Sequence, residues 1–258
     1  IKDGSIKSVV QGIKWPALAS SSGAVRLASL CQLEQTQWWS EEKLRKYQFK
    51  QINTLLQHCV QHVPYYQEVL GNGITLDGVS EEQWLNIPIL TRDTVQQMGE
   101  KLRTENLPPD HGKAFMQRTS GSTGKPIEVL GTGITSFFWD VFTLRDHFWH
   151  QRDLSGKLAV VRYTEDKRAE LPQGVVSKNW GRATAGVFET GATTLISIFT
   201  PISKLVAWLQ RDAPDYLLTH PSVLQDLVLY CQKENVQLPS LREVRTISEA
   251  LPDGLREL

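Results

Sequence analysis

The spacing of apolar residues predicts a long helix between Ser40 and Val63. Ser40 can cap its first turn, and Glu41 and Glu42 carry negative charge where the helix dipole favours it. The apolar positions recur at threes and fours, as on the core-facing stripe of a helix: Leu44, Tyr47, Ile52, Leu55, Leu56, Cys59, Val60 and Val63. Pro64 disfavours a continuation. We therefore expect a helix that buries one face and ends before Pro64.

From residue 136 onward the pattern predicts helices and strands in alternation. An aromatic-rich helix is expected over 136–149. The expected strands are 157–163, 193–197, 215–218 and 244–247, and the expected helices are 201–210 and 221–234. A further helix is expected from Pro252 onward, over residues 252–258. Alternation of this kind is typical of the α/β class, with a mainly parallel sheet flanked by helices. We expect an irregular arm over residues 1–35, followed by one domain over 36–258.

The segment from Thr119 to Pro126 carries the strongest chemical signal. Its residues are Thr119, Ser120, Gly121, Ser122, Thr123, Gly124, Lys125 and Pro126. Hydroxyls, bare backbone N–H groups and a lysine can converge on phosphate oxygens, and glycine permits close approach. Residues 114–118 and 127–130 alternate as strands do, so the segment is expected at the tip of a β-hairpin. Pro126 replaces the hydroxyl residue of a Walker loop, which disfavours a kinase or NTPase of that type.

This loop resembles the phosphate loop of adenylate-forming enzymes, the acyl-CoA synthetase superfamily. The nearest branch is similar to phenylacetate–coenzyme A ligase and its capsule-biosynthesis relatives. Weaker similarities lie at 62–66, 87–92, 218–224 and 246–251. The resemblance covers roughly residues 45–258. It implies that this chain is part of an N-terminal adenylation domain. The C-terminal domain and the magnesium ligands would then lie beyond Leu258, and the present chain alone would be inactive.

The resemblance also implies a reaction and its cofactors. A carboxylic acid reacts with ATP and Mg²⁺ to give an acyl-adenylate, and the acyl group then passes to coenzyme A or a carrier protein. The loop residues Thr119, Ser120, Gly121, Ser122, Thr123, Gly124 and Lys125 would bind the ATP phosphates, with Lys125 catalytic. The adenine and acyl groups would lie near His220, Pro221, Ser222, Ser248 and Glu249.

The predicted topology places the last of these residues at one edge of the sheet. Residues 219–222 follow one strand and open a helix, whose N-terminus favours an anion. Ser248 and Glu249 follow the next strand. Ligands of open α/β sheets bind beyond the carboxyl ends of the strands. We therefore expect both segments and the phosphate loop to converge on one nucleotide.

Composition narrows the alternatives. The formal net charge is zero, with 28 basic and 28 acidic residues, which gives no field for binding nucleic acid. Cys31, Cys59 and Cys231 fit neither a zinc site nor a disulfide framework, so a cytoplasmic location is expected. No apolar run is long enough for a membrane span. A non-catalytic module for nucleotide binding or interaction, derived from the same fold, remains the alternative function.

Overall fold

The computed structural model describes residues 6–71, 79–118 and 126–258. Its contacts divide the chain into two compact units: residues 1–28 together with 140–258, and residues 29–139. The helix α1 (Ser21–Thr36) and the helix α6 (Gly133–Trp149) each contribute residues to both units.

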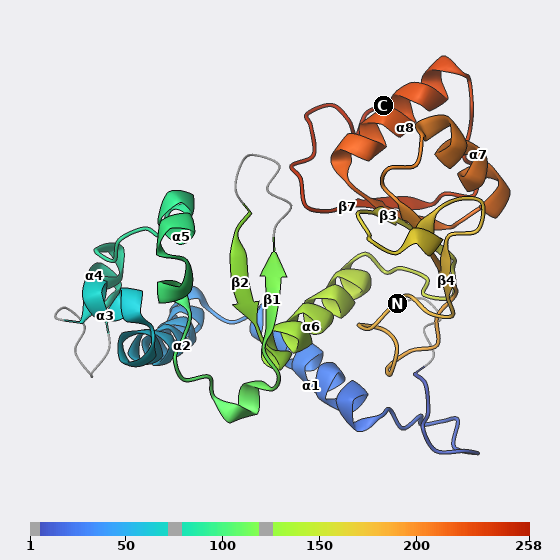
Figure 1. Ribbon diagram of the computed structural model, residues 1–258. Helices are drawn as coiled ribbons and strands as arrows, with labels where there is room; N and C mark the ends of the chain where they lie inside the picture. The colour runs from blue at the N-terminus through green and yellow to red at the C-terminus, as the bar shows by residue number, and fades with distance from the viewer. Residues whose placement is uncertain (1–5, 72–78, 119–125) are drawn as a thin grey trace. The chain divides into compact units, whose positions relative to one another are not determined.

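The first unit is built on a five-stranded sheet (Figure 1). In spatial order the strands are β4 (Val175–Ser177), β5 (Thr193–Ser197), β3 (Leu158–Arg162), β6 (Tyr216–Thr219) and β7 (Glu243–Thr246). The strands β5, β3, β6 and β7 are parallel, and β4 is an antiparallel edge strand. This confirms the predicted α/β class with a mainly parallel sheet. The strand β4 was not predicted, because three residues are too few to show an alternation.

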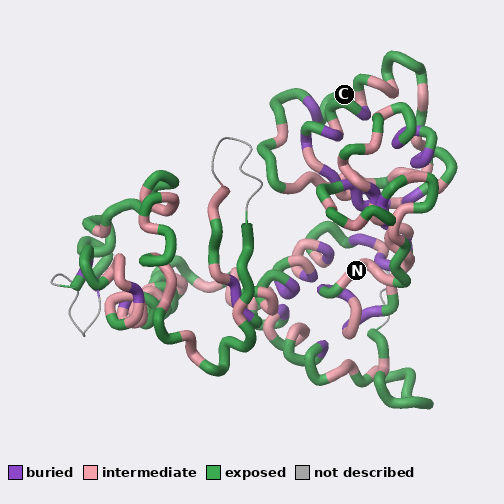
Figure 2. Tube along the Cα trace, viewed as in Figure 1, coloured by how far each residue is buried: buried purple, intermediate pink, exposed green. Residues whose placement is uncertain are grey.

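The helices α7 (Ile202–Asp212) and α8 (Pro221–Lys233) pack against the same core as the sheet. This core contains Ala159, Val161, Ile196 and Leu217 from the strands, with Leu205, Val206, Trp208, Leu209, Val223 and Leu227 from the helices. Leu158, Val160 and Tyr216 form a separate cluster with Trp180. Alternate residues of β3 therefore belong to two clusters, as expected for a strand covered on both faces. Figure 2 shows the buried residues gathered along these strands.

The helix α1 corrects the expectation of an irregular arm over residues 1–35. Ser20 begins the helix: its hydroxyl accepts a hydrogen bond from Gly23 N at 3.1 Å, and its carbonyl accepts one from Ala24 N at 2.7 Å. Leu27 packs against a cluster that contains Leu144 and Leu154. Tertiary packing therefore stabilises a helix whose opening Ser-Ser-Gly run has a low intrinsic propensity for helix.

The second unit contains the predicted helix α2 (Glu41–His62), which Ser40 caps through a hydrogen bond from Lys43 N at 3.3 Å. The shorter helices are α3 (Pro64–Leu70), α4 (Glu81–Leu85), α5 (Arg92–Met98) and the 3-10 turns η1 (Gly99–Leu102) and η2 (Pro109–His111). Their core is small, with Leu56, Leu70 and Val79 buried. The first unit also contains a 3-10 turn, η3 (Lys167–Ala169).

The predicted hairpin strands are present in the second unit. The strand β1 (Phe115–Arg118) pairs antiparallel with β2 (Glu128–Gly131), and Arg118 lies opposite Glu128. The connecting residues 119–125, which carry the phosphate-loop motif, lie outside the described residues.

The last residues of the chain differ from the sequence prediction. A helix was expected from Pro252 onward, whereas 253–257 form turns. Gly254 has φ +77°, in the left-handed region, and this interrupts a right-handed helix.

Candidate functional site

The topology of the first unit marks one edge of its sheet as a candidate site. After β3 the chain leaves toward β5 and β4, whereas after β6 it leaves toward β7. Neighbouring strands whose connections run in opposite directions leave a crevice at their carboxyl ends, where ligands of open α/β sheets bind. His220 directly follows β6 at this edge.

The structure brings together the two segments that the sequence placed at this edge. The Glu249 carboxylate accepts hydrogen bonds from Ser222 N at 2.9 Å and from Ser222 Oγ at 3.1 Å. His220 Nδ1 lies 3.5 Å from Glu249 Oε1. Pro221 occupies the first helical position, where it lacks an N–H that the helix would leave unpaired. Ser248 has φ +67°, so this non-glycine residue turns the chain in the left-handed region.

These contacts make Glu249 the cap of α8. His220 is the N-cap residue, but its side chain makes no capping hydrogen bond. The hydrogen bond from the Ser222 backbone is the main reason that the pKa of Glu249 lies below its usual value, with further support from the Ser222 hydroxyl and His220. The Glu249 carboxylate of the same chain therefore lies at this helix N-terminus, where negative charge is favoured, and binding of a nucleotide beside these residues stays a prediction.

The structure does not describe the predicted phosphate site. Thr119–Lys125 lie outside the described residues, and the hairpin that holds them belongs to the other compact unit. Convergence of the loop with His220 and Glu249 on one nucleotide therefore stays a prediction. At the described end of the hairpin, Glu128 lies 3.7 Å from Arg118 and 3.5 Å from Arg103.

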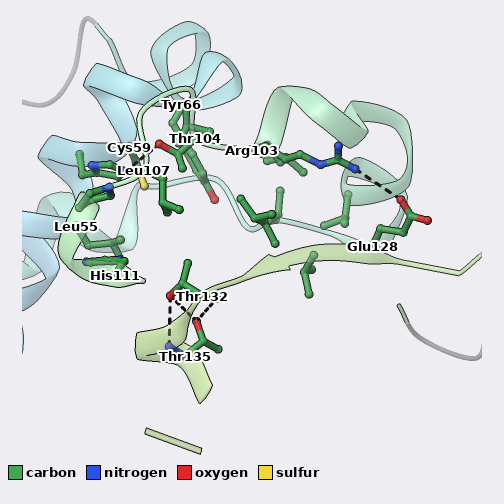
Figure 3. Close-up of a pocket in the computed structure, with 18 of the residues that line it drawn as sticks. Leu55, Cys59, Tyr66, Arg103, Thr104, Leu107, His111, Glu128, Thr132 and Thr135 are labelled. Carbon is green, nitrogen blue, oxygen red and sulfur yellow. Dashed lines mark hydrogen bonds and ion pairs between the residues drawn. The ribbon is translucent and has the colours of Figure 1, made fainter. Parts of the chain in front are cut away.

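Sequence reasoning missed a cavity in the second unit (Figure 3). Its volume is about 560 Å³, and its walls come from α2, η1, β2 and the first turn of α6. Leu55, Cys59, Leu107 and Leu130 are among the apolar residues that line it. The available signal was the wide apolar stripe of α2, which the sequence analysis assigned wholly to the core.

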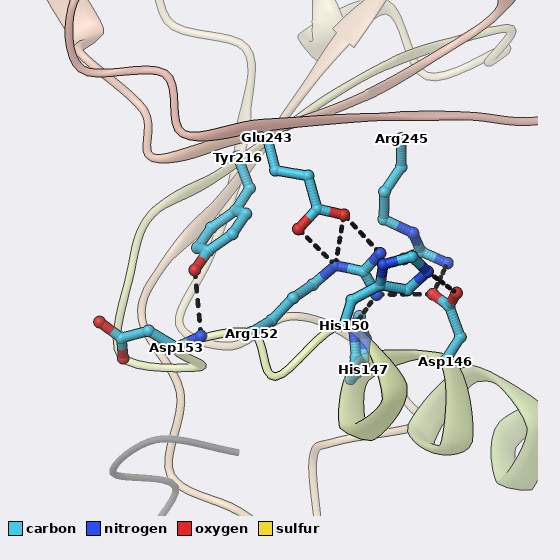
Figure 4. A network of polar contacts seen from close by, with 8 residues as sticks. All are labelled: Asp146, His147, His150, Arg152, Asp153, Tyr216, Glu243 and Arg245. Atoms are coloured by element: carbon cyan, nitrogen blue, oxygen red, sulfur yellow. Dashed lines mark hydrogen bonds and ion pairs between the residues drawn. The ribbon is translucent and has the colours of Figure 1, made fainter.

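A second missed feature is an ionic network in the first unit (Figure 4). Arg152, only 3% exposed, donates to Glu243 from Nε at 2.9 Å and to Asp146 from Nη1 at 2.6 Å. Arg245 Nη2 also lies 2.7 Å from Asp146. The network therefore ties the end of α6 to the strand β7.

His147 is the neutral member of this network. Its Nδ1 lies 3.2 Å from Arg152 Nη1, and since the guanidinium can only donate, Nδ1 accepts. Burial, followed by the charges of Arg245 and Arg152, lowers the pKa of His147 to about 3. Within the described ranges, no three His, Cys, Asp or Glu side chains gather to hold a metal ion.

No helix in the described part of the chain combines the length and the apolar character needed to cross a membrane. No protein-family model and no curated protein matches the sequence.

Solved structures do resemble this chain. An open conformation of 2-hydroxyisobutyryl-CoA ligase in complex with 2-HIB-AMP and CoA matches with a TM-score of 0.56 at 16% identity, over 82% of this chain and 50% of that one. The same ligase in its thioesterification state, also with 2-HIB-AMP and CoA, gives a TM-score of 0.53 at 16% identity over 76% and 41% of the two chains. The postadenylation state with 2-HIB-AMP gives 0.50 at 16% identity over 73% and 39%.

The present chain thus spans at most about half the length of the ligase that it matches. Identities this low are evidence about the fold and not about the reaction. The chain has an α/β fold similar to that of an adenylate-forming CoA ligase.

Proposed function

We propose that this chain belongs to an enzyme that activates a carboxylic acid with ATP and then transfers the acyl group to coenzyme A. The observation that carries the proposal is the fold, which is similar to that of a ligase solved with an acyl-AMP and CoA. The motif Thr119–Pro126 supports it independently, because it joins β1 to β2 and offers hydroxyls, glycines and a lysine suited to phosphate.

The proposed reaction has two steps. A carboxylate oxygen attacks the α-phosphorus of ATP, the bond to the β-phosphate oxygen breaks, and pyrophosphate leaves. The sulfur of coenzyme A, as its thiolate, then attacks the acyl carbon and AMP leaves. Positioning and charge neutralisation supply most of the catalysis in phosphoryl transfer, so the protein needs few covalent roles.

The residues of the phosphate loop supply that neutralisation in our proposal. The hydroxyls of Ser120, Ser122 and Thr123, the backbone amides and the Lys125 ammonium bind the β- and γ-phosphates and the departing pyrophosphate. We propose that Mg²⁺ enters bound to ATP, as part of the substrate, and that its protein ligand lies outside this chain, as the resemblance to adenylate-forming enzymes implies.

The carboxyl edge of the sheet binds the adenylate in this proposal. His220 and Pro221 directly follow β6 at the carboxyl edge of the sheet, next to Ser222 and the turn at Ser248. Glu249 is already engaged with Ser222, so it positions the α8 N-terminus and does not itself contact the nucleotide. This division gives the segment 248–249 a defined role: Ser248 shapes the turn and Glu249 fixes it to α8.

The identity of the acid is a finer proposal, which rests on the resemblance to phenylacetate–coenzyme A ligase. We propose an aromatic acid, with coenzyme A or a carrier protein as the acceptor and the cytoplasm as the place of action. A panel of aryl-acetic, benzoic, fatty and amino acids separates these substrate classes.

The test is carboxylate-dependent exchange of pyrophosphate into ATP, measured on the natural full-length polypeptide that contains this chain. Replacing Lys125 by alanine should slow exchange by about 10²–10³-fold, the typical cost of one transition-state charge contact. The matched control is Lys113→Ala, which removes an exposed lysine before β1 and should leave the rate unchanged.

Two outcomes would contradict the proposal. Equal exchange rates in the two variants would remove Lys125 from the mechanism. ATP binding without exchange for any acid in the panel would identify the protein as the non-catalytic nucleotide-binding module.

A further inference from the structure

The helix α2 has two apolar faces, and only one of them is packed in the core. Ile52, Leu56 and Val60 contribute to the cluster that also holds Leu70 and Val79. Leu55 and Cys59, one helical turn apart, line the cavity instead. Leu55 is 57% exposed. An apolar stripe that is wider than the core it packs against leaves apolar surface available to another molecule.

The opposite wall of the cavity is also apolar. Leu102 from the turn η1, Leu107 from the loop that follows and Leu130 from β2 also line the cavity. Figure 3 labels Leu107 among them. Voids in protein interiors are seldom larger than a water molecule, whereas sites for small molecules have volumes of about 300–1,000 Å³. The volume of about 560 Å³ falls in the second range.

The polar groups of the cavity carry little net charge to offer a ligand. Arg103 is paired with Glu100 at 2.9 Å and with Glu128 at 3.5 Å. The Thr104 hydroxyl donates to the Asn106 carbonyl at 3.1 Å, so it accepts from His58 Nε2 at 3.0 Å. Burial, with His62 and His111 nearby, lowers the pKa of His58 and favours the neutral ring. Thr132 and Thr135 hydrogen bond to each other at 3.3 Å.

From this lining we infer a second ligand site: the cavity between α2, η1 and β2 binds a small, neutral, largely apolar organic molecule. Among the described lining residues Arg103 is the only Lys or Arg, and the carboxylates of Glu100 and Glu128 neutralise its charge through Nη1 and Nη2, which leaves only the buried Nε without a hydrogen-bond partner. An anion would therefore be buried without a free counter-charge, which is unfavourable. The inference goes beyond the proposed adenylation reaction, since it needs neither ATP nor the phosphate loop.

The first test compares two fluorescent probes that differ by one charged group. N-phenyl-1-naphthylamine is neutral and apolar, and 1-anilinonaphthalene-8-sulfonate adds a sulfonate to the same rings. We expect saturable binding of the neutral probe, at least about tenfold tighter than that of the sulfonate, because the cavity offers the sulfonate no counter-charge. Equal or tighter binding of the sulfonate would overturn the assignment of a neutral ligand.

Matched substitutions locate the bound probe. Leu107→Trp fills the cavity and should weaken binding of the neutral probe at least about tenfold. Leu85→Trp makes the same change on α4, at a position that is 81% exposed and does not line the cavity, and should leave binding unchanged. Equal affinities of the two variants for the neutral probe would contradict the proposal that the probe binds in this cavity.

Cys59 supplies a readout that needs no substitution. N-ethylmaleimide labelling is followed at each cysteine by peptide mass spectrometry, with and without the neutral probe. The bound probe should slow the labelling of Cys59 about fivefold or more, because it covers the cavity wall. Labelling of the exposed Cys31 should not change. Unchanged labelling of Cys59 at saturating probe would sink the proposal, even if Leu107→Trp fails to fold.

Discussion

Glu249 links its own charge state to the stability of α8, since its carboxylate accepts two hydrogen bonds from Ser222. Because its pKa is lowered in the folded protein, the unfolded state takes up its proton first as the pH falls. The stabilisation is therefore complete above the pKa of the unfolded chain, about 4.3. It is lost as the pH falls below that value and through the lower pKa of the folded state.

We predict that Glu249→Gln lowers the free energy of unfolding by about 0.5–1 kcal/mol at neutral pH, the usual scale of an N-cap. Urea denaturation at several pH values measures the effect. The difference in the free energy of unfolding between wild type and variant should shrink below a pH of about 4.3, where Glu249 becomes protonated and is uncharged like the glutamine.

Glu234→Gln is the control for this prediction, because it removes the same charge at the other end of α8, where the C-cap carboxylate lies 3.6 Å from Lys233. It should cost less than Glu249→Gln at neutral pH. A difference for Glu249→Gln that persists unchanged at pH 3 would show that its charge does not stabilise the helix.

Arg152 allows a buried and an exposed ion pair to be compared within one unit. We predict that Arg152→Met lowers the free energy of unfolding by about 2–4 kcal/mol, because it leaves Glu243 and Asp146 without the buried arginine that they share. Arg242→Met should cost less than about 1 kcal/mol, since Arg242 is 59% exposed and its ion pairs are screened by water. Urea denaturation of both variants measures the difference, and equal costs would contradict it.

The sequence could predict contacts that follow from topology but not contacts that depend on packing. The predicted topology placed residues 220–222 and 248–249 at the same edge, because each segment follows a strand of one parallel sheet. It could not place Arg152 against Glu243, since a loop arginine 91 positions from its partner has no periodic signature. It also could not show that Glu249 faces inward to Ser222 and not outward to a ligand.

At the scale of elements, the same distinction separates the correct predictions from the wrong ones. The strands β3, β5, β6 and β7 were predicted to within two residues at each end, because buried strands and their flanking helices have clear periods. The helix α1 was missed because its stability comes from tertiary contacts such as those of Leu27. The expected C-terminal helix was wrong because Gly254 adopts a left-handed conformation.

The helix α2 shows what a hydrophobic stripe leaves undecided. The spacing of its apolar residues predicted the helix correctly, and Ser40 predicted the cap. The spacing shows on which side of the helix the apolar face lies, but it does not show which element packs against that face. Ile52 and Leu56 contact the core, whereas Leu55 and Cys59 line a cavity. The division of one stripe into two surfaces depends on where η1 and β2 lie, which no local pattern specifies.

At the scale of the whole molecule, the two compact units differ in the size of their described cores. One cluster of the first unit contains ten buried residues from both strands and helices. The cluster around Leu56 in the second unit contains three. Because burial of apolar surface is the main favourable term in folding, the second unit should open locally at a lower free energy.

We predict that backbone amides of β3 and β6 exchange with deuterium at least about tenfold more slowly than those in the middle of α2, which corresponds to about 1.4 kcal/mol in opening free energy. Hydrogen-exchange mass spectrometry on the whole chain measures both regions in one sample, so each is the other's control once intrinsic exchange rates are divided out. If the cavity beside α2 binds its apolar ligand, N-phenyl-1-naphthylamine should slow exchange in α2 and leave β3 unchanged, because a ligand stabilises the state that binds it. Equal protection of α2 and β3 without probe would mean that the small cluster around Leu56 is not what limits the opening of the second unit.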